Sequence, residues 1–225
     1  IMKSSSKIVY IVIICFALTV ATGCATKPVK HSGFLKNYPE FKSGSKGGAD
    51  SVYMKEGVDF SVYNKIMMDH VVFYFRDDSK DKEIHPEELS EFSEIFHKAV
   101  AESLGDAYPL VSEPGPDVMR LRIAITDVDA SKPGMGAVST VMPVGLALSI
   151  VKKGITGKHT GVGSASIEVE ILDSMTNERI AAAIDTKPGG KIEGFSKWGA
   201  VEGAFKFWAK RLRIWLDETH GKEGD

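Results

Sequence analysis

The alternation of apolar and polar residues between Ala165 and Ile184 most strongly limits what this chain can fold into. Apolar side chains occupy every second position in two runs, which a polar turn at 173–177 separates. The apolar positions are Ala165, Ile167, Val169 and Ile171, followed by Ile180, Ala182 and Ile184. A period of two predicts a β-hairpin with one apolar face. Because an isolated hairpin is at best marginally stable in water, other elements must cover that face.

A long amphipathic helix near the end of the sequence is predicted to provide this cover. Between about residues 195 and 218, large apolar residues are spaced by three and four positions. They are Trp198, Val201, Phe205, Trp208, Leu212 and Trp215. This spacing is typical of a helix with one apolar face. The alternative is a helix that lies on a membrane surface, which tryptophan and basic residues also suit. We favour packing on the sheet, because the hairpin otherwise lacks a covering layer.

The first half of the chain indicates another strand and another helix. The apolar run at 71–75 predicts a strand that is buried on both faces. A helix then begins at Pro86, since proline suits the first helical position, and Glu87 and Glu88 favour the positive end of the helix dipole. Its apolar positions continue with helical spacing to Gly105.

A further strand at 119–126 has one apolar face and one mixed face that carries Arg120 and Arg122. Two arginines on one face can bind an acidic ligand, but structural pairing on a half-solvated sheet is the interpretation we favour. The element order predicts a single α+β domain at 52–225, in which two helices cover a mainly antiparallel sheet of four or five strands. A chain of 225 residues with 43% hydrophobic residues is long enough for one such core.

Between the strand that ends near Asp129 and the hairpin lies an apolar, glycine-rich and uncharged insert at 134–151. A connection between strands of a soluble domain rarely contains so many apolar residues. Its short length and Pro143 argue against a membrane-spanning helix. Three interpretations remain open: a helix packed on the domain, a self-association surface, and a segment that enters a membrane. The candidate interaction residues are Met135, Val138, Val141, Met142, Val144, Leu146, Leu148 and Ile150.

The beginning of the sequence has the pattern of a secretory signal peptide. A basic stretch at 2–7 precedes the apolar run 8–20, which is too short to span the ~30 Å hydrocarbon core of a bilayer. Small residues at 21–23 then precede Cys24, a pattern that resembles the lipobox of bacterial lipoproteins. We therefore predict that residues 1–23 are removed and that Cys24 becomes the lipid attachment site, with acyl chains such as palmitate as the anchor. A buried N-terminal helix or an uncleaved anchor is the alternative.

This prediction has consequences for disulfides and for location. Of the two cysteines, Cys15 would leave with the signal peptide, so no disulfide is expected. Ala25 follows Cys24, and the resemblance to lipoproteins then implies an outer-membrane lipoprotein facing the periplasm if the source is Gram-negative. Residues 24–51 are expected to form a lipidated tether and a Gly/Ser-rich linker. Within it, the aromatic stretch 33–41 is predicted to pack on the domain as a lid, or alternatively to bind a partner as an exposed peptide.

Three short motifs resemble the DUF3313 family of uncharacterised bacterial lipoproteins. They are Ser32-Gly33-Phe34-Leu35 with Tyr38 after two further residues, the turn at 114–117 that leads into the strand 121–127, and the later strand 166–173. The resemblance covers most of the chain after Cys24. It implies a lipoprotein of the cell envelope with this fold, and it brings no activity, substrate or catalytic residue.

The sequence offers few catalytic patterns, and we expect neither an enzyme nor a bound cofactor or metal. The six histidines do not fall in metal-binding pairs. Acids at 77–88 match part of a calcium-binding loop, but Lys82 stands where glycine is required, which favours a solvated turn. An envelope hydrolase that uses Asp127, Asp129 or Ser164 remains an alternative, although turn capping is the role we favour for the two acids.

The charge balance limits the class of partner. With 28 basic and 30 acidic residues, the chain has a formal net charge of −2, and no nucleic-acid partner is predicted. The hypothesis is a non-catalytic binding or assembly lipoprotein, attached to the membrane by its N-terminal lipid, which contacts a protein partner or another copy of itself. A small-ligand carrier with a pocket between the sheet and the helices is a further alternative.

Overall fold

The computed structural model describes residues 31–45, 47–77, 79, 84–130, 163–189 and 197–222. The chain divides into two compact units, residues 1–30 and 31–225, and every described residue belongs to the second unit. The expected signal peptide with Cys24 and the apolar insert at 134–151 lie outside the described residues. Both therefore remain predictions.

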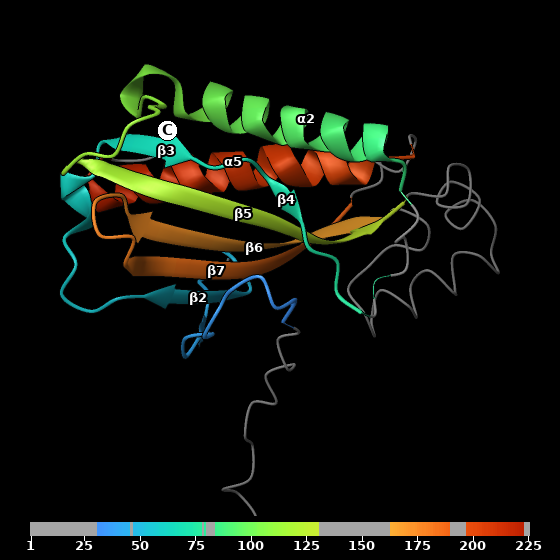
Figure 1. Ribbon diagram of the computed structural model, residues 1–225, viewed down its shortest axis with the longest axis horizontal. Helices are drawn as coiled ribbons and strands as arrows, with labels where there is room; N and C mark the ends of the chain where they lie inside the picture. The colour runs from blue at the N-terminus through green and yellow to red at the C-terminus, as the bar shows by residue number, and fades with distance from the viewer. Residues whose placement is uncertain are drawn as a thin grey trace, which may run out of the picture. The chain divides into compact units, whose positions relative to one another are not determined.

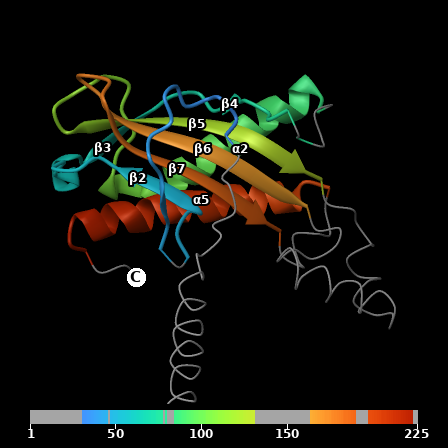
Figure 2. The ribbon, with the colours of Figure 1, turned by 90° about the horizontal axis from the view of Figure 1, so that it is seen from below.

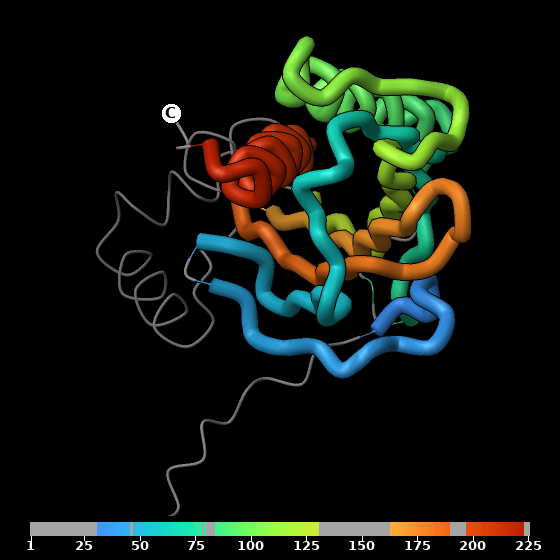
Figure 3. The backbone as a smooth tube through the Cα atoms, turned by 90° about the vertical axis from the view of Figure 1, so that its left-hand side faces the viewer, coloured from blue at the N-terminus to red at the C-terminus, as the bar shows by residue number. Residues whose placement is uncertain are grey.

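The described residues form one mixed sheet and two long helices (Figure 1). In chain order the elements are β1 (Lys42–Ser43), β2 (Ser51–Met54), the 3-10 turn η2 (Phe60–Val62), β3 (Lys65–Met68), β4 (Val72–Phe73), α2 (Pro86–Leu104), the 3-10 turn η3 (Gly105–Ala107), β5 (Val118–Asp129), β6 (Ser164–Asp173), β7 (Arg179–Pro188) and α5 (Gly199–Thr219). The strand order is β1-β2-β7-β6-β5-β3, and β4 also pairs with β5. Both helices lie on one face of the sheet (Figures 2 and 3).

The β6–β7 hairpin is the centre of the sheet, and its presence is as predicted. The expected apolar face is wrong for β7, because Ala182 and Ile184 lie opposite Glu170 and Glu168 and share the face of those two acids. The two strands pair antiparallel, with Val169 opposite Ala183. The turn between them contains Asn177, whose φ of 56° is the left-handed conformation that asparagine tolerates. Odd-numbered side chains of β6 face the helices, while Glu168 and Glu170 face the other side of the sheet.

The sheet is mainly antiparallel, as predicted, but the expected count of four or five strands is wrong. The sheet has seven strands among the described residues, and it is mixed, because β3 and β4 run parallel to β5. The chain passes from β4 through α2 into β5, and a helical crossover of this kind joins parallel strands. The additional strands β1, β2 and β3 contain only two to four residues, too few for a visible alternation.

The run at 71–75 is also less buried than expected. Only Val72–Phe73 forms a strand, and this strand lies at the edge of the sheet. Val71 is buried and Phe73 packs against the core, but Val72 is 41% exposed and Tyr74 is 47% exposed. A strand at this edge has one face toward the helices and one toward solvent, so the prediction of burial on both faces is wrong.

The two helices pack on each other and on the sheet through aromatic side chains. Helix α2 begins at Pro86, as predicted, and buries Phe92 and Phe96. Phe96 stacks on Phe205 of α5, with ring centroids 4.6 Å apart and an interplanar angle of 1°. The predicted apolar face of α5 therefore covers the sheet, and the alternative of a membrane-surface helix is not needed. Within the ranges described above, no helix combines the length and apolar content needed to cross a membrane.

Candidate functional site

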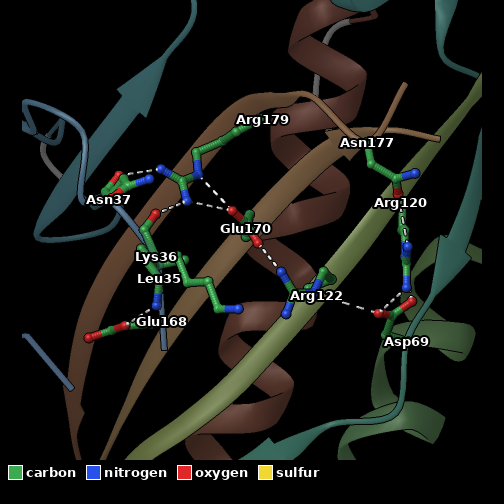
Figure 4. Close-up of polar contacts among 10 residues, drawn as sticks. All are labelled: Leu35, Lys36, Asn37, Asp69, Arg120, Arg122, Glu168, Glu170, Asn177 and Arg179. Atoms are coloured by element: carbon green, nitrogen blue, oxygen red, sulfur yellow. Dashed lines mark hydrogen bonds and ion pairs between the residues drawn. The ribbon is translucent and has the colours of Figure 1, made fainter. Parts of the chain in front are cut away.

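The face of the sheet opposite the helices carries a group of acidic and basic side chains. It consists of Asp69, Arg120, Arg122, Glu168, Glu170 and Arg179, which we call the charged face (Figure 4). These residues come from β5, β6, the start of β7 and the segment between β3 and β4. Their positions follow from the strand period of two, which places every second residue of β5 and β6 on this side.

Apart from Glu168, the charges of this face form a continuous chain of ion pairs. Arg120 binds Asp69 in a bidentate manner, with Nε and Nη2 each 2.8 Å from a carboxylate oxygen. Hydrogen bonding to Asp69 raises the pKa of Arg120 above its usual value. Arg122 lies between Asp69 and Glu170 and pairs with both carboxylates. Arg179 Nε then donates to Glu170 Oε1 at 2.7 Å, so each carboxylate of this chain is shared between two arginines.

Residues 31–41, which we call the N-terminal segment, lie on the charged face. Glu168 has an exposed fraction of 0% and receives two short hydrogen bonds from this segment. The donors are the Ser32 backbone N–H at 2.6 Å and the Tyr38 hydroxyl at 2.7 Å. The Leu35 N–H approaches the same carboxylate at 3.4 Å, and the Leu35 side chain is only 1% exposed. The predicted lid is therefore confirmed, and the stretch expected as a tether and linker is already part of the compact unit from His31 onward.

Arg179 binds the middle of the same segment. Its guanidinium donates to the backbone carbonyl oxygens of Lys36 at 2.6 Å and of Asn37 at 2.7 Å (Figure 4). Asn37 has a φ of 52°, and this turn precedes Tyr38. Burial and the hydrogen bond to Glu168 raise the pKa of Tyr38, which keeps the hydroxyl protonated as a donor.

Sequence reasoning did not identify Glu168 or Arg179. Both occupy polar positions of a strand pattern, and such positions normally face solvent. The signal that was present is the repetition of acids at Glu168 and Glu170 and of arginines at Arg120 and Arg122, each on one face of its strand. In the sheet only Glu170 lies directly opposite an arginine, Arg122. The expectation that the two arginines pair structurally is confirmed.

A second feature is an apolar groove on the helix side of the sheet, between β7 and α5. It has a volume of about 340 Å³. We call it the edge groove and define it by Val52, Met54, Ala181, Ala183, Trp208 and Trp215. At its floor, Asp185 accepts hydrogen bonds from Trp208 Nε1 at 2.6 Å and from the Asp50 N–H at 2.9 Å. Burial raises the pKa of Asp185.

The hydrolase candidates are held in the sheet. Asp127 forms an ion pair with Arg76 at 3.0 Å and accepts a hydrogen bond from the Ser79 hydroxyl at 2.5 Å. Asp129 and Ser164 are cross-strand partners at the end of β5 and the beginning of β6, and Ser164 is buried. Among the residues that the structure describes, no group of three or more His, Cys, Asp or Glu side chains is arranged to hold a metal ion. Cys24 and the eight interaction candidates of the insert lie outside the residues that the structure describes.

Comparison with known proteins gives a family match and two groups of relatives. Residues 30–212 match the family described as "Protein of unknown function (DUF3313)". The chain is 27% identical over 190 residues to the "Uncharacterized lipoprotein YdcL" of Escherichia coli strain K12, across 82% of this chain and 84% of the relative. YdcL of Escherichia coli O157:H7 gives the same values.

The solved structures that resemble this chain are more distant. Two dodecamers of PelC from Paraburkholderia phytofirmans each cover 72% of this chain, and 95% or 96% of PelC, at 12% identity and a TM-score of 0.41. At this level of similarity we transfer neither the assembly nor any role of PelC to this chain.

Proposed function

Because the chain belongs to the DUF3313 family, as its motifs indicated, we propose that it acts as a membrane-anchored lipoprotein of the bacterial envelope with a non-catalytic binding or assembly role. The family carries no assigned activity, and the similar YdcL is named only as a lipoprotein. In this proposal, residues 1–23 are a cleaved signal peptide and Cys24 carries the lipid. The location is the outer membrane, facing the periplasm, if the source is Gram-negative.

The observation that carries this proposal is the attachment of the N-terminal segment to the charged face. Glu168 and Arg179 bind the chain from Ser32 to Tyr38, so the chain is attached to the domain from about residue 32. The stretch from Cys24 to His31 spans at most about 25 Å when fully extended. A lipid on Cys24 would therefore keep the domain within this distance of the membrane surface and limit how the domain can turn.

Contacts with proteins are the second part of the proposal. The ionised groups of the charged face are bound to one another and to the N-terminal segment, and Asp127 is bound by Arg76 and Ser79. Such pairing supports a structural role for these groups rather than the hydrolase alternative. The proposed contact surface is the insert at 134–151, and the partner is an envelope protein or another copy of this chain.

The lipid can be tested in cells that express the full chain. We expect intact-mass analysis to show a chain that begins at Cys24 and carries acyl groups, and fractionation to place it in the membrane. Cys24→Ala should lose the acyl groups, whereas Cys15→Ala should keep them. An intact leader, or an unmodified thiol at position 24 in the parent, would contradict the anchored role.

The assembly role needs a separate measurement. Crosslinking of the lipidated full chain in its membrane should yield a defined protein adduct, and a variant that lacks residues 134–151 should lose it while keeping its lipid. A parent that stays monomeric and captures no envelope protein would contradict this role. If alanine at Asp127, Asp129 or Ser164 abolished the cellular role without loss of folding, the hydrolase alternative would replace it.

A further inference from the structure

The edge groove is open because the two helices do not cover the whole sheet. Helix α5 lies over β6 and β7, and the short strand β2 forms the outer wall on the far side of β7. Met54 on this wall is 43% exposed, although it is a large apolar side chain. The volume of about 340 Å³ lies within the range of about 300–1,000 Å³ that is usual for small-molecule sites.

The shape of the groove is encoded by the alanines of β7. Ala181 and Ala183 face the helices, because their cross-strand partners Ile171 and Val169 do so. The neighbouring strand fills this face with branched side chains, but β7 leaves the space above its two alanines unfilled. An unfilled apolar space weakens a fold, since its lining loses packing contacts. Retention of such a space is consistent with a molecule that fills it.

One cation stands at the rim of this apolar space. Arg211 lines the groove and is half-buried, and its guanidinium makes no hydrogen bond or ion pair with any residue that the structure describes. The other charged groups of the lining are Asp185 and Glu218. Asp185 is occupied by Trp208 and by a backbone N–H. Glu218 lies two helical turns from Arg211, about 10.5 Å along the axis, which exceeds the Debye length of about 8 Å at physiological ionic strength.

We propose that the edge groove binds the alkyl chain of a free single-chain amphiphile whose anionic carboxylate pairs with Arg211. The alkyl chain lies over Ala181 and Ala183, between β2 and α5, and displaces water from Met54 and from the exposed part of Trp215. Burial of each additional methylene should tighten binding about fourfold until the groove is full. This site is independent of the protein contacts proposed above, because it uses no residue of the insert.

The test uses the full chain in nanodiscs of zwitterionic phospholipid. Decanoic acid with a terminal diazirine is added, activated by light, and the labelled peptides are identified by mass spectrometry. We expect saturable labelling of peptides from β7 and α5. Decanoate should compete at a concentration at least tenfold lower than decanol, which has the same chain and no charge. Labelling that does not saturate, or equal competition by the two compounds, would overturn the proposal.

Variants separate the two parts of the site. Ala183→Leu fills the groove and should weaken labelling at least tenfold, and Ala181→Val provides a smaller change if the first variant unfolds. Arg211→Ala should retain competition by decanol and lose the preference for decanoate. Lys210→Ala removes the same charge from the exposed side of α5 and should behave like the parent. The proposal is wrong if a folded Ala183→Leu chain is labelled as the parent is, or if Arg211→Ala keeps the preference.

Discussion

Replacing Glu168 with glutamine should release the N-terminal segment from the sheet while the helices and the core stay folded. The carboxylate accepts hydrogen bonds from the Ser32 N–H at 2.6 Å and the Tyr38 hydroxyl at 2.7 Å, and it lies 3.4 Å from the Leu35 N–H. A net contribution of about 1.5–3 kcal/mol is typical of a hydrogen bond to a charged group. Glutamine keeps one oxygen but directs an N–H₂ group at a donor, so we expect a loss of about 3 kcal/mol.

This loss should appear as local opening. A change of 3 kcal/mol corresponds to about a 100-fold increase in the open population, since every 1.4 kcal/mol is tenfold. Hydrogen exchange measured on a peptide covering 31–41 should therefore accelerate about 100-fold, while peptides of α2 and α5 change little. Glu40→Gln is the matched control, because Glu40 is an exposed acid of the same segment. If Glu168→Gln left exchange at 31–41 within threefold of the parent, the carboxylate would not be what holds the segment.

Three further substitutions test other parts of the structure. Arg179→Met should destabilise the fold by about 3–5 kcal/mol in urea unfolding, because it leaves the buried carboxylate of Glu170 without one of its partners; a loss below 1 kcal/mol would show that Arg122 alone satisfies that carboxylate. Phe205→Ala should cost about 3–5 kcal/mol in the same assay, since it removes a fully buried ring that stacks on α2, and an unchanged midpoint would place the core elsewhere. Burial and a hydrogen bond to the carboxylate of Asp217 in α5 raise the pKa of Tyr108 from 10.0 to about 12. The folded state favours the protonated form of Tyr108. Its contribution to the free energy of unfolding is therefore complete below pH 10 and is lost as the pH rises from 10 to 12. Tyr108→Phe should lower the free energy of unfolding by about 1–2 kcal/mol at pH 8. In urea unfolding, the variant should also lose less stability than the parent between pH 10 and 12; an equal loss in both would mean that another group causes it.

The sequence predicted the elements whose pattern repeats over several turns or residue pairs. The β6–β7 hairpin, the helix from Pro86 and the apolar face of α5 each depend on five or more positions with one period. Burial of one face of a strand or helix sets that period, so the period can be recognised in the sequence without knowing which elements pack against that face. The parallel direction of β3 and β4 depends instead on the crossover through α2, which only the order of the elements indicates.

The candidate sites were less visible for a different reason. Glu168 is a surface residue by pattern, and it is buried only because a segment more than a hundred residues away folds over it. The edge groove depends on Ala181 and Ala183 having large neighbours on both sides, which is a property of strand pairing and not of either strand alone. Arg122 and Arg179 likewise meet at Glu170 only once the register of β5, β6 and β7 is fixed.

The pairing of Asp129 with Ser164 has a consequence for how this chain can vary. The two residues are direct neighbours across β5 and β6, so the polypeptide leaves the sheet and re-enters it at adjacent points. Lengthening such an excursion adds only about 0.6 kcal/mol of closure entropy for each doubling. Descendants of one ancestral chain can therefore lengthen, shorten or replace the connection between these two residues and still inherit the same scaffold, which makes this stretch the natural place for specialisation.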